Sequence, residues 1–339
     1  MKRHMCAFLI LSLMVSAFSF AGCTEIPAPA TNPSTTNPAP STQVTTTAPT
    51  EATIPTTIPP ETTIPPTTIP ETTVPPTTAP PTTVPENTPP TTEAIINPDE
   101  YIGSLYTRGQ LHAMDNTLKG YGCGRTGNTT RPGGAVSAQK AYGKYNATYI
   151  GNNEPTIYLT FDCGYEFNNL TANILDTLKA KNVKAVFFVT LSYCKKNPQL
   201  VRRMINEGHV VGNHSANHYS MPTISIDGMV HEIMALHNYV LEKFSYEMTL
   251  FRPPKGEYSV RSLSLTQSLG YESVFWSYAY QDWNTSAQPD VQSAFQLTTS
   301  CAHNGGIFLL HAVSATNAAM LGDLIDNLQS RGYSLQLYS

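Results

Sequence analysis

Two short polar stretches in the second half of the chain carry the side chains most able to do chemistry. The first places Asp162 and Cys163 shortly after the apolar run 157–159. The second places His214 and His218 shortly after another apolar segment. In α/β folds, ligands bind at the carboxyl ends of buried strands. A carboxylate and two imidazoles in that position predict a metal-assisted hydrolase, in which the thiol is the unusual member.

The two histidines are four residues apart, at His214 and His218. In a helical turn this spacing would put both rings on one face, within reach of one cation. Surface or capping histidines are the ordinary explanation of such a pair, but its place at a strand end favours a metal site. Imidazole suits Zn²⁺, Co²⁺ or Fe²⁺ better than Mg²⁺. We therefore expect a divalent ion, with Zn²⁺ first and Co²⁺, Mn²⁺ or Mg²⁺ as alternatives.

A general base and a general acid are also available at strand ends. Asp162 is a natural base, and Arg252 could keep it ionised because an adjacent cation lowers a carboxyl pKa. The ordinary explanation of Arg252 is a structural salt bridge, and both interpretations can be true. His311 follows the apolar run 307–310 and is a candidate acid, with Asp282 as its orienting partner. A lone histidine there would more often be a core residue, but the surrounding set favours the site.

The two tryptophans of the chain, Trp276 and Trp283, bracket this region of the sequence. An aromatic face can cover a sugar ring or an acetyl methyl group, so Trp283 is a candidate for an apolar wall of the site. Core packing is an equally good interpretation of Trp276.

Strand and helix patterns alternate through the part of the chain that carries these candidates. The seven strand patterns lie at 156–161, 184–189, 209–212, 248–252, 273–278, 306–310 and 333–338. The helix patterns lie at 168–180, 198–208, 227–243, 260–269, 289–302 and 318–331. This alternation predicts an α/β domain of parallel βαβ units, with a doubly wound open sheet as the alternative. Seven strands predict a deformed (β/α) barrel, in which the scattered strand ends converge on one face.

The first residues are typical of an exported protein. Residues 1–22 combine a basic start, an apolar run too short to span a bilayer comfortably, and small residues before Cys23. Cys23 resembles the lipid-modified cysteine of a bacterial lipoprotein, although Phe20 stands where leucine is usual. An ordinary cleaved signal peptide with an incidental cysteine is the alternative. Several acyl chains would anchor the protein stably to the outer face of the cell membrane.

Residues 23–96 cannot form a core because Thr, Pro and Ala dominate them. Proline fixes φ and removes donors, so this segment is predicted to be a disordered, extended tether. At about 3 Å per residue it could reach on the order of 200 Å, from a membrane into a cell wall. We expect an irregular N-terminal extension at 97–153, which packs on a catalytic domain at 154–339.

The part of the chain after the tether is nearly neutral. Of the 20 basic and 24 acidic residues in the chain, 2 basic and 8 acidic residues precede Arg108, which leaves 18 and 16 from there on. Nucleic-acid binding would need a basic face, so it is not expected. We predict a monomer. Four cysteines in this part could form two disulfides in three connectivities, which the sequence does not distinguish: Cys123, Cys163, Cys194 and Cys301.

Five motifs follow one another along 154–338: Thr160-Phe161-Asp162, His214-Ser215-x-x-His218, Arg252-Pro253-Pro254, Asp282-Trp283 and Leu310-His311. Together they resemble the signature motifs of polysaccharide deacetylases, carbohydrate esterase family 4. Within that family, the finer sequence resembles the peptidoglycan N-acetylmuramic acid deacetylases that lead to muramic δ-lactam. That likeness rests on Phe161-Asp162-x-Gly164-Tyr165-Glu166, Gly212-Asn213-His214-Ser215, Phe275-Trp276-Ser277 and Leu309-Leu310-His311-x-Val313-Ser314.

The resemblance implies a deformed (β/α) barrel that removes N-acetyl groups from an amino sugar with the help of a divalent metal. By motif, it implies the base Asp162, the metal ligands His214 and His218, the acid His311, and the positioning residues Arg252 and Asp282. Trp283 and Tyr165 would contact the substrate. The backbone N–H of Lys255, after the Arg-Pro-Pro motif, would help to hold the oxyanion.

Cys163 departs from the family pattern. Most members have a second aspartate at this position, which ligates the metal, whereas the muramic acid branch typically has asparagine. A Cys163 thiolate could bind Zn²⁺. Alternatively, the residue is simply small, and two histidines and water hold the ion; a disulfide is the third option.

The leading hypothesis is a membrane-tethered hydrolase that deacetylates N-acetylmuramic acid in peptidoglycan. Deacetylation of N-acetylglucosamine in peptidoglycan, chitin or a biofilm glycan is the alternative within the class. A non-catalytic glycan-binding wall lipoprotein, whose site has decayed at Cys163, is less consistent with the other retained residues. An unrelated metallo-amidase is disfavoured by the five ordered motifs.

Overall fold

The structure is a computed structural model that describes residues 96–103, 105–124 and 127–339. All of these residues belong to one compact unit. The predicted secretion signal, Cys23 and the predicted tether up to residue 95 lie outside the described residues. Within the described ranges, no helix is both long and apolar enough to cross a membrane.

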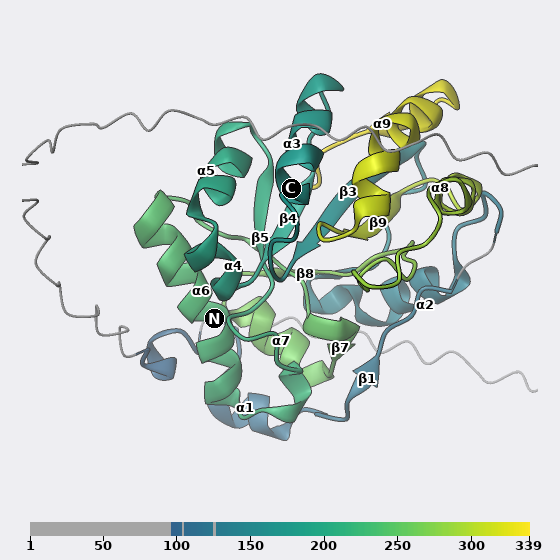
Figure 1. Ribbon diagram of the computed structural model, residues 1–339. Coiled ribbons are helices and arrows are strands. Elements are labelled where there is room, and N and C mark those ends of the chain that lie inside the picture. Colours follow the sequence, from purple (N-terminus) through teal and green to yellow (C-terminus); the bar gives the residue numbers. More distant parts are fainter. Residues whose placement is uncertain (1–95, 104, 125–126) are drawn as a thin grey trace, which may run out of the picture. The chain divides into compact units, whose positions relative to one another are not determined.

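A parallel sheet forms the centre of the described domain (Figure 1). Its strands follow the order β10-β3-β4-β5-β6-β8-β2, and β9 lies outside this path and also pairs with β3. The strands are β2 (Ala147–Thr148), β3 (Thr156–Cys163), β4 (Val186–Val189), β5 (Val210–Asn213), β6 (Leu250–Phe251), β8 (Glu272–Val274), β9 (Gly306–His311) and β10 (Ser334–Leu335). The seven predicted strands are therefore present, and β2 is an eighth that its two-residue length hides in the sequence.

The sheet curls until its two sides meet. β9 runs beside β3 from the Ile157–Gly306 pair to the Asp162–His311 pair. The chain that leaves β8 reaches the other side of β9, where Tyr278 and Phe308 form an isolated parallel bridge. This bridge closes a ring through β3, β4, β5, β6, β8 and β9. The prediction of a deformed (β/α) barrel is confirmed.

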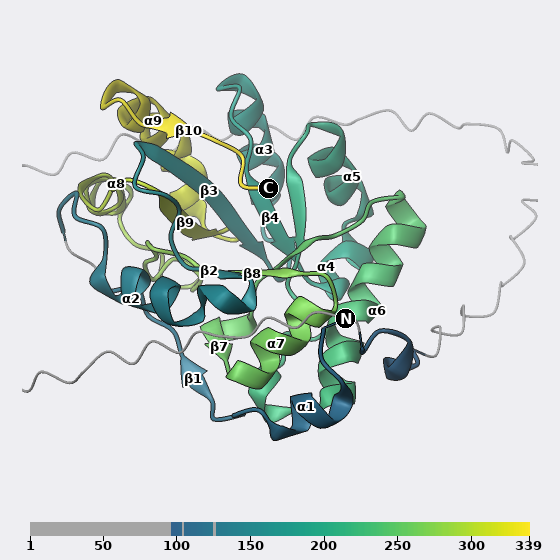
Figure 2. The same cartoon turned by 180° about the vertical axis from the view of Figure 1, so that it is seen from behind.

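Helices cover the outside of the barrel (Figures 1 and 2). They pack side by side in the order α8, α9, α3, α5, α4, α6 and α7. Their bounds are α3 (Leu170–Ala180), α4 (Leu191–Lys196), α5 (Pro198–Asn206), α6 (Ile226–Phe244), α7 (Val260–Ser268), α8 (Val291–Ser300) and α9 (Ala315–Ser330). Only α4 was not predicted, because six residues are too few to show an amphipathic period.

Alternation along the strands separates the outer core from the barrel interior. Phe187 packs in the large cluster between sheet and helices, whereas its neighbour Phe188 packs in a smaller cluster inside the barrel. Residues paired on adjacent parallel strands point to the same face. Asp162 pairs with Phe188, and Cys163 pairs with Val189, which belongs to the outer cluster. Asp162 therefore faces the barrel interior, and Cys163 faces the helices.

The segment before β3 was predicted to be irregular, but it contains short regular elements, including a ten-residue helix. These are η1 (Pro98–Glu100), α1 (Arg108–Ala113), β1 (Lys119–Gly120), α2 (Gly133–Tyr142), η2 (Gly143–Tyr145) and β2. β1 pairs antiparallel with β7 (Glu257–Tyr258), and β2 joins the main sheet. Tyr149 stacks on Phe275 with ring centroids 4.2 Å apart. The segment thus extends the barrel wall beside β8.

Candidate active site

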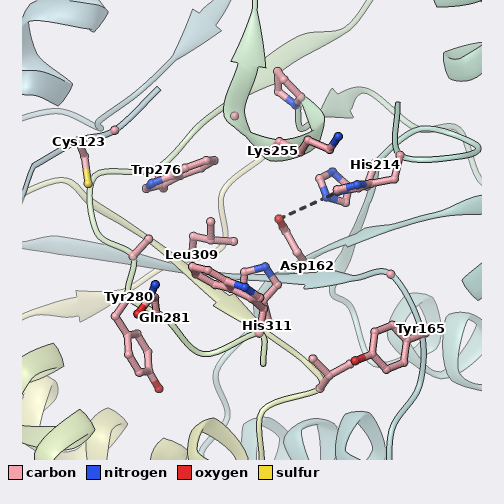
Figure 3. A pocket seen from close by; sticks show the side chains of 18 of the residues that line it. Cys123, Asp162, Tyr165, His214, Lys255, Trp276, Tyr280, Gln281, Leu309 and His311 are labelled. Carbon is pink, nitrogen blue, oxygen red and sulfur yellow. Dashed lines mark hydrogen bonds and ion pairs between the residues drawn. The ribbon is translucent and has the colours of Figure 1, made fainter. Parts of the chain in front are cut away.

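A cavity of about 720 Å³ lies at the carboxyl ends of the barrel strands (Figure 3). The candidate side chains converge there from separate strand ends. Asp162 lies near the end of β3, His214 and His218 lie in the loop after β5, and His311 is the last residue of β9. Lys255 and Trp283 also line the cavity. These predicted site residues thus lie together at one end of the barrel.

Arg252 fixes the carboxylate of Asp162. Its Nη1 donates to Asp162 Oδ1 at 2.8 Å and to Thr160 Oγ1 at 2.9 Å. The guanidinium is fully buried and lies over the Phe188 ring, 4.1 Å from the centroid. Gly212 leaves room for that ring, since a Cβ there would approach it to 2.5 Å. The salt bridge and the positioning role proposed for Arg252 are therefore compatible.

The charge on Asp162 is stabilised from several sides. Burial alone would raise the pKa of this carboxyl, but the positive charge and hydrogen bond of Arg252, together with the neighbouring rings of His214 and His311, outweigh it and lower the pKa. Asp162 Oδ2 lies 3.4 Å from His214 Nε2. Asp162 is thus held as a carboxylate, with one oxygen on Arg252 and the other toward the cavity, which is the form that a general base needs.

The two histidines do not lie on a helical turn, contrary to the sequence prediction. The segment between them is a loop in which Ser215 and His218 adopt positive φ values of 67° and 60°. Ser215 Oγ accepts the backbone N–H of His218 at 2.9 Å. This tight loop, and not helical periodicity, brings the Nε2 atoms of His214 and His218 to 3.2 Å from each other.

The hydrogen bonds of His214 select the tautomer that a metal ligand needs. Its Nδ1 lies 2.8 Å from the backbone carbonyl oxygen of Arg252, so it donates and leaves a lone pair on Nε2. Burial lowers the pKa of His214. Burial, together with the neighbouring His214 ring, also lowers the pKa of His218, to about 4. Both rings are therefore neutral near pH 7.

Two neutral imidazoles whose Nε2 atoms approach each other fit a divalent ion, since Zn–N bonds of about 2.0–2.1 Å can span such a gap from both sides. In the part of the chain that the structure describes, no group of three or more His, Cys, Asp or Glu side chains is arranged to hold a metal ion. The protein thus offers a histidine pair, with Asp162 beside it, as the donor set.

Glu232 holds the histidine loop, and sequence reasoning did not find it. The side chain comes from α6 and is only 2% exposed. Its two carboxylate oxygens accept the backbone N–H of Asn217 at 2.8 Å and the side-chain amide of Asn217 at 2.7 Å. Its carbonyl oxygen accepts the backbone N–H of Ala216 at 2.8 Å. A glutamate on an amphipathic helix is usually exposed, so the sequence gives no sign of this contact.

His311 has a different environment from the histidine pair. Its Nδ1 lies 2.7 Å from Asp282 Oδ1, and its backbone N–H donates to Asp282 Oδ2 at 2.8 Å. Burial would lower the pKa of His311, but the hydrogen bond and negative charge of Asp282 raise it. Because Asp282 holds Nδ1, Nε2 is the ring nitrogen available to the cavity. A cationic ring in this orientation can act as a general acid.

Asn317 completes the support of Asp282 and was also missed. Its side-chain amide donates to Asp282 Oδ2 at 2.6 Å, and its own carbonyl oxygen accepts the hydroxyl of Tyr280. Asp282 and Asn317 are both essentially buried. Asn317 lies in the first turn of α9, where asparagine commonly satisfies local backbone groups, so its type alone did not suggest this contact.

Cys163 lies apart from the histidine pair. Its side chain is fully buried in the outer cluster, and its Sγ approaches the carbonyl oxygen of Phe161 at 4.0 Å. Burial raises the pKa of this thiol well above its usual value. Cys163, Cys194 and Cys301 are free and buried. Facing the helices as a neutral thiol, Cys163 occupies a small core position.

Aromatic and apolar side chains form the remaining walls. Trp283 is 51% exposed, and its ring centroid lies 5.8 Å from that of His311. Tyr165 is 49% exposed and also lines the cavity (Figure 3). Trp276 and Leu309 line the end of the cavity where Cys123 also lies. Cys123 comes from the segment before β2, whose part in the site the sequence did not predict.

The geometry agrees with the comparisons to known proteins. A family model described as "Polysaccharide deacetylase" matches residues 150–274. The peptidoglycan-N-acetylmuramic acid deacetylase PdaA of Bacillus subtilis is 39% identical over 229 residues, which are 67% of this chain and 87% of that protein. The chain belongs to the polysaccharide deacetylase family. The resemblance stated from the five motifs is confirmed, and the chain is a deacetylase of this family.

Solved structures of family members share the fold. That of Bacillus subtilis PdaA, a family 4 carbohydrate esterase, matches with a TM-score of 0.63 and covers 66% of this chain and 96% of that chain. A family 4 carbohydrate esterase from Bacillus anthracis is 35% identical, with a TM-score of 0.55 and the same coverage. A peptidoglycan-N-acetylglucosamine deacetylase of Bacillus cereus is 32% identical over 187 residues, which are 54% of this chain and 86% of that protein. The family thus includes deacetylases named for either amino sugar.

Proposed function

We propose that this deacetylase hydrolyses the acetamido group of N-acetylmuramic acid residues in peptidoglycan. The observation that carries the proposal is the placement around a single cavity of the Arg252-bound carboxylate of Asp162, the His214–His218 pair and the Asp282-bound ring of His311. Asp162 and His311 are register partners on β3 and β9, so both point into that cavity. A base and an acid on one side of an amide are what its hydrolysis requires.

In this proposal Asp162 takes a proton from the water that attacks the acetyl carbonyl carbon. Its ionised state and its contact with Arg252 keep the accepting oxygen aimed at the cavity. The backbone N–H of Lys255 holds the oxygen on which negative charge develops. His311 gives its Nε2 proton to the amide nitrogen as the carbon–nitrogen bond breaks. The products are acetate and the free amine of the sugar.

His214 and His218 would hold the divalent ion, for which we propose Zn²⁺ because imidazole nitrogens suit it. When bound, such an ion lowers the pKa of water and polarises a carbonyl group. The buried Cys163 thiol favours the interpretation in which two histidines and water hold the ion over the one in which a thiolate ligates it. Trp283 and Tyr165, both half exposed at the cavity, would contact the sugar rings.

Muramic acid is proposed as the substrate because PdaA of Bacillus subtilis, the relative that is 39% identical, is named for this sugar. The test is to incubate the purified protein and Zn²⁺ with peptidoglycan glycan strands and to measure released acetate. Mass spectrometry of the digested strands should then show the loss of one acetyl group from muramic acid. Acetate that comes only from glucosamine units or chitooligosaccharides would refute the proposal.

Deacetylation of N-acetylglucosamine is the second candidate. The Bacillus cereus relative, 32% identical, is named for this sugar, and both sugars present the same acetamido group to the site. The mass spectrometric assignment of the modified sugar separates the two functions. Glycan binding without acetate release would instead indicate a non-catalytic wall protein.

We also propose that the protein is an exported monomer, anchored by lipid on Cys23 at the outer face of the cell membrane. The support is the sequence of residues 1–22 and the wall polymer on which the named relatives act. Metabolic labelling with a fatty-acid analogue should mark the wild type and not Cys23→Ser. Equal labelling of both would contradict the lipid anchor.

A further inference from the structure

Lys255 places a positive charge beside the histidine pair. Among the residues that line the cavity in the described structure, it is the single lysine or arginine. Its side chain is exposed and lines the same cavity as His214 and His218 (Figure 3). After burial and the neighbouring His214 ring, the Lys255 charge is a further cause that lowers the pKa of His218. A positive charge in the same cavity opposes the binding of a divalent ion to the histidines by repulsion. Its presence therefore indicates a separate role for Lys255.

The backbone holds this lysine in place. Lys255 has a φ of 60°, a region that non-glycine residues rarely occupy. The turn is constrained on its far side, because Gly256 also has a positive φ and a Cβ there would approach the Trp276 ring to 2.7 Å. The conformation thus follows from the packing of the turn and directs the lysine side chain to the cavity.

The charge of Lys255 is not balanced by a salt bridge in the described part of the chain. Lys255 has no carboxylate partner among the described residues. Asp162 is paired with Arg252, and Asp282 with His311. A divalent ion on the histidines would make the cavity still more positive. An anionic group on the substrate would be stabilised there, since a charge-assisted hydrogen bond is stronger than a neutral one.

The two candidate sugars differ in the group that Lys255 could bind. Both carry an acetamido group on carbon 2, but only muramic acid carries a lactyl ether on the adjacent carbon 3. The lactyl group ends in a carboxylate when no peptide is attached, and in a neutral amide when one is. A cation beside the acetamido site can therefore reach this carboxylate on muramic acid and finds no equivalent on glucosamine.

We propose that the Lys255 ammonium binds the unsubstituted lactyl carboxylate of muramic acid and so selects this sugar over glucosamine. The inference rests on the proposed function and adds the residue that distinguishes muramic acid from glucosamine. Lys255 then contributes twice, with its backbone N–H at the acetyl group and its ammonium at the neighbouring substituent. Arginine would keep this interaction, and glutamine would remove its charge at similar side-chain length.

The test compares kcat/KM for wild type, Lys255→Gln and Lys255→Arg on glycan strands with unsubstituted lactyl groups and on chitooligosaccharides. Lys255→Gln should lower the ratio of the first value to the second by about 10- to 100-fold, mainly through KM, as expected for a lost charge-assisted hydrogen bond. Lys255→Arg should retain most of the ratio. Raising the salt concentration should increase the wild-type KM on the strands because it screens the exposed charge.

Lys179→Gln is the matched control, because Lys179 is an exposed lysine on α3 that does not line this cavity. Thermal unfolding of each variant checks the fold. A ratio that is unchanged in Lys255→Gln, or that falls equally in Lys179→Gln, overturns the role of Lys255. A wild type that releases acetate only from chitooligosaccharides overturns the proposed function itself, so the two failures are distinct.

Discussion

The two sides of the cavity shift the pKa of the same side chain, histidine, in opposite directions. On one side, burial lowers the pKa of His214 and His218, so both are neutral. On the other side, the contact of Asp282 raises the pKa of His311 despite its burial. A neutral imidazole can bind a metal ion, and a cationic one can give up a proton. The backbone and carboxylate partners of each ring, and not its residue type, therefore set its role.

On the side of the cavity that holds the histidine pair, substitution of the base Asp162 should have the largest effect on catalysis. Asp162→Asn keeps a hydrogen-bonding oxygen for Arg252 but cannot take a proton at neutral pH. We expect kcat for acetate release to fall by about 10²–10⁴-fold, the usual contribution of a general base. The measurement is acetate release under saturating Zn²⁺, with circular dichroism to confirm the fold. A variant that keeps more than about a tenth of the wild-type kcat would exclude Asp162 as the base.

Asp282→Asn changes the other side of the cavity and should bring the pKa of His311 closer to that of the histidine pair. It removes the negative charge that raises the pKa of His311, and we expect kcat to fall by about 10²-fold. The acid must be protonated, so activity is lost as pH rises through the pKa of His311. Lowering that pKa moves this loss to lower pH. The pH profile of kcat measures the shift.

The matched control for Asp282→Asn is Arg252→Lys, which alters the support of the base. It should lower kcat without moving the alkaline loss of activity downward. If both variants shift the profile equally, the two sides of the cavity are not electrostatically separate, and the assignment of His311 as the acid fails.

Glu232→Gln tests how far the histidine pair depends on its loop. The variant replaces one of the two carboxylate oxygens that hold Asn217 with an amide donor. We expect the affinity for Zn²⁺ to fall by about 10-fold, in the range for residues that support metal ligands. Competition with a chromogenic chelator measures this affinity directly. Glu242→Gln, at an exposed position on the same helix, should leave it unchanged, and an equal loss in both variants would mean that Glu232 has no special role.

Much of the fold could be predicted because its signals are local. The seven strands and six helices have the periodic patterns or caps that sequence reasoning detects, such as Pro198 at the start of α5. β2 and α4 were missed because two and six residues carry no period, and α1 and α2 were missed because the segment before β3 has only weak periodicity. The barrel closure through Tyr278 and Phe308 depends on the curl of the whole sheet, which no local pattern encodes.

The site was predicted less completely than the fold, for a physical reason. Asp162, His214 and His311 stand at strand ends, so their position follows from the strand pattern. Glu232 and Asn317 lie on helices and reach the site only through tertiary packing. The histidine spacing was interpreted as a helical turn, but a loop with two positive φ values produces the same proximity. Spacing in sequence predicted the pair, and only the structure gives its geometry.

Cys163 should have the smallest effect of all, although it stands next to the base. Neighbouring residues of a strand point to opposite faces, so Asp162 faces the cavity and Cys163 faces the helices. We expect Cys163→Ala to keep Zn²⁺ content and kcat within about 2-fold of wild type and to lower stability by about 1 kcal/mol, through the loss of one buried atom. Cys163→Asp would bury an unpaired charge and should be destabilised by about 3 kcal/mol or more. Metal analysis, acetate release and chemical denaturation of the three proteins measure these quantities. If Cys163→Ala lost metal and activity together, the thiol would be a ligand, and the separation between the core face and the cavity face of β3 would not hold at its last residue.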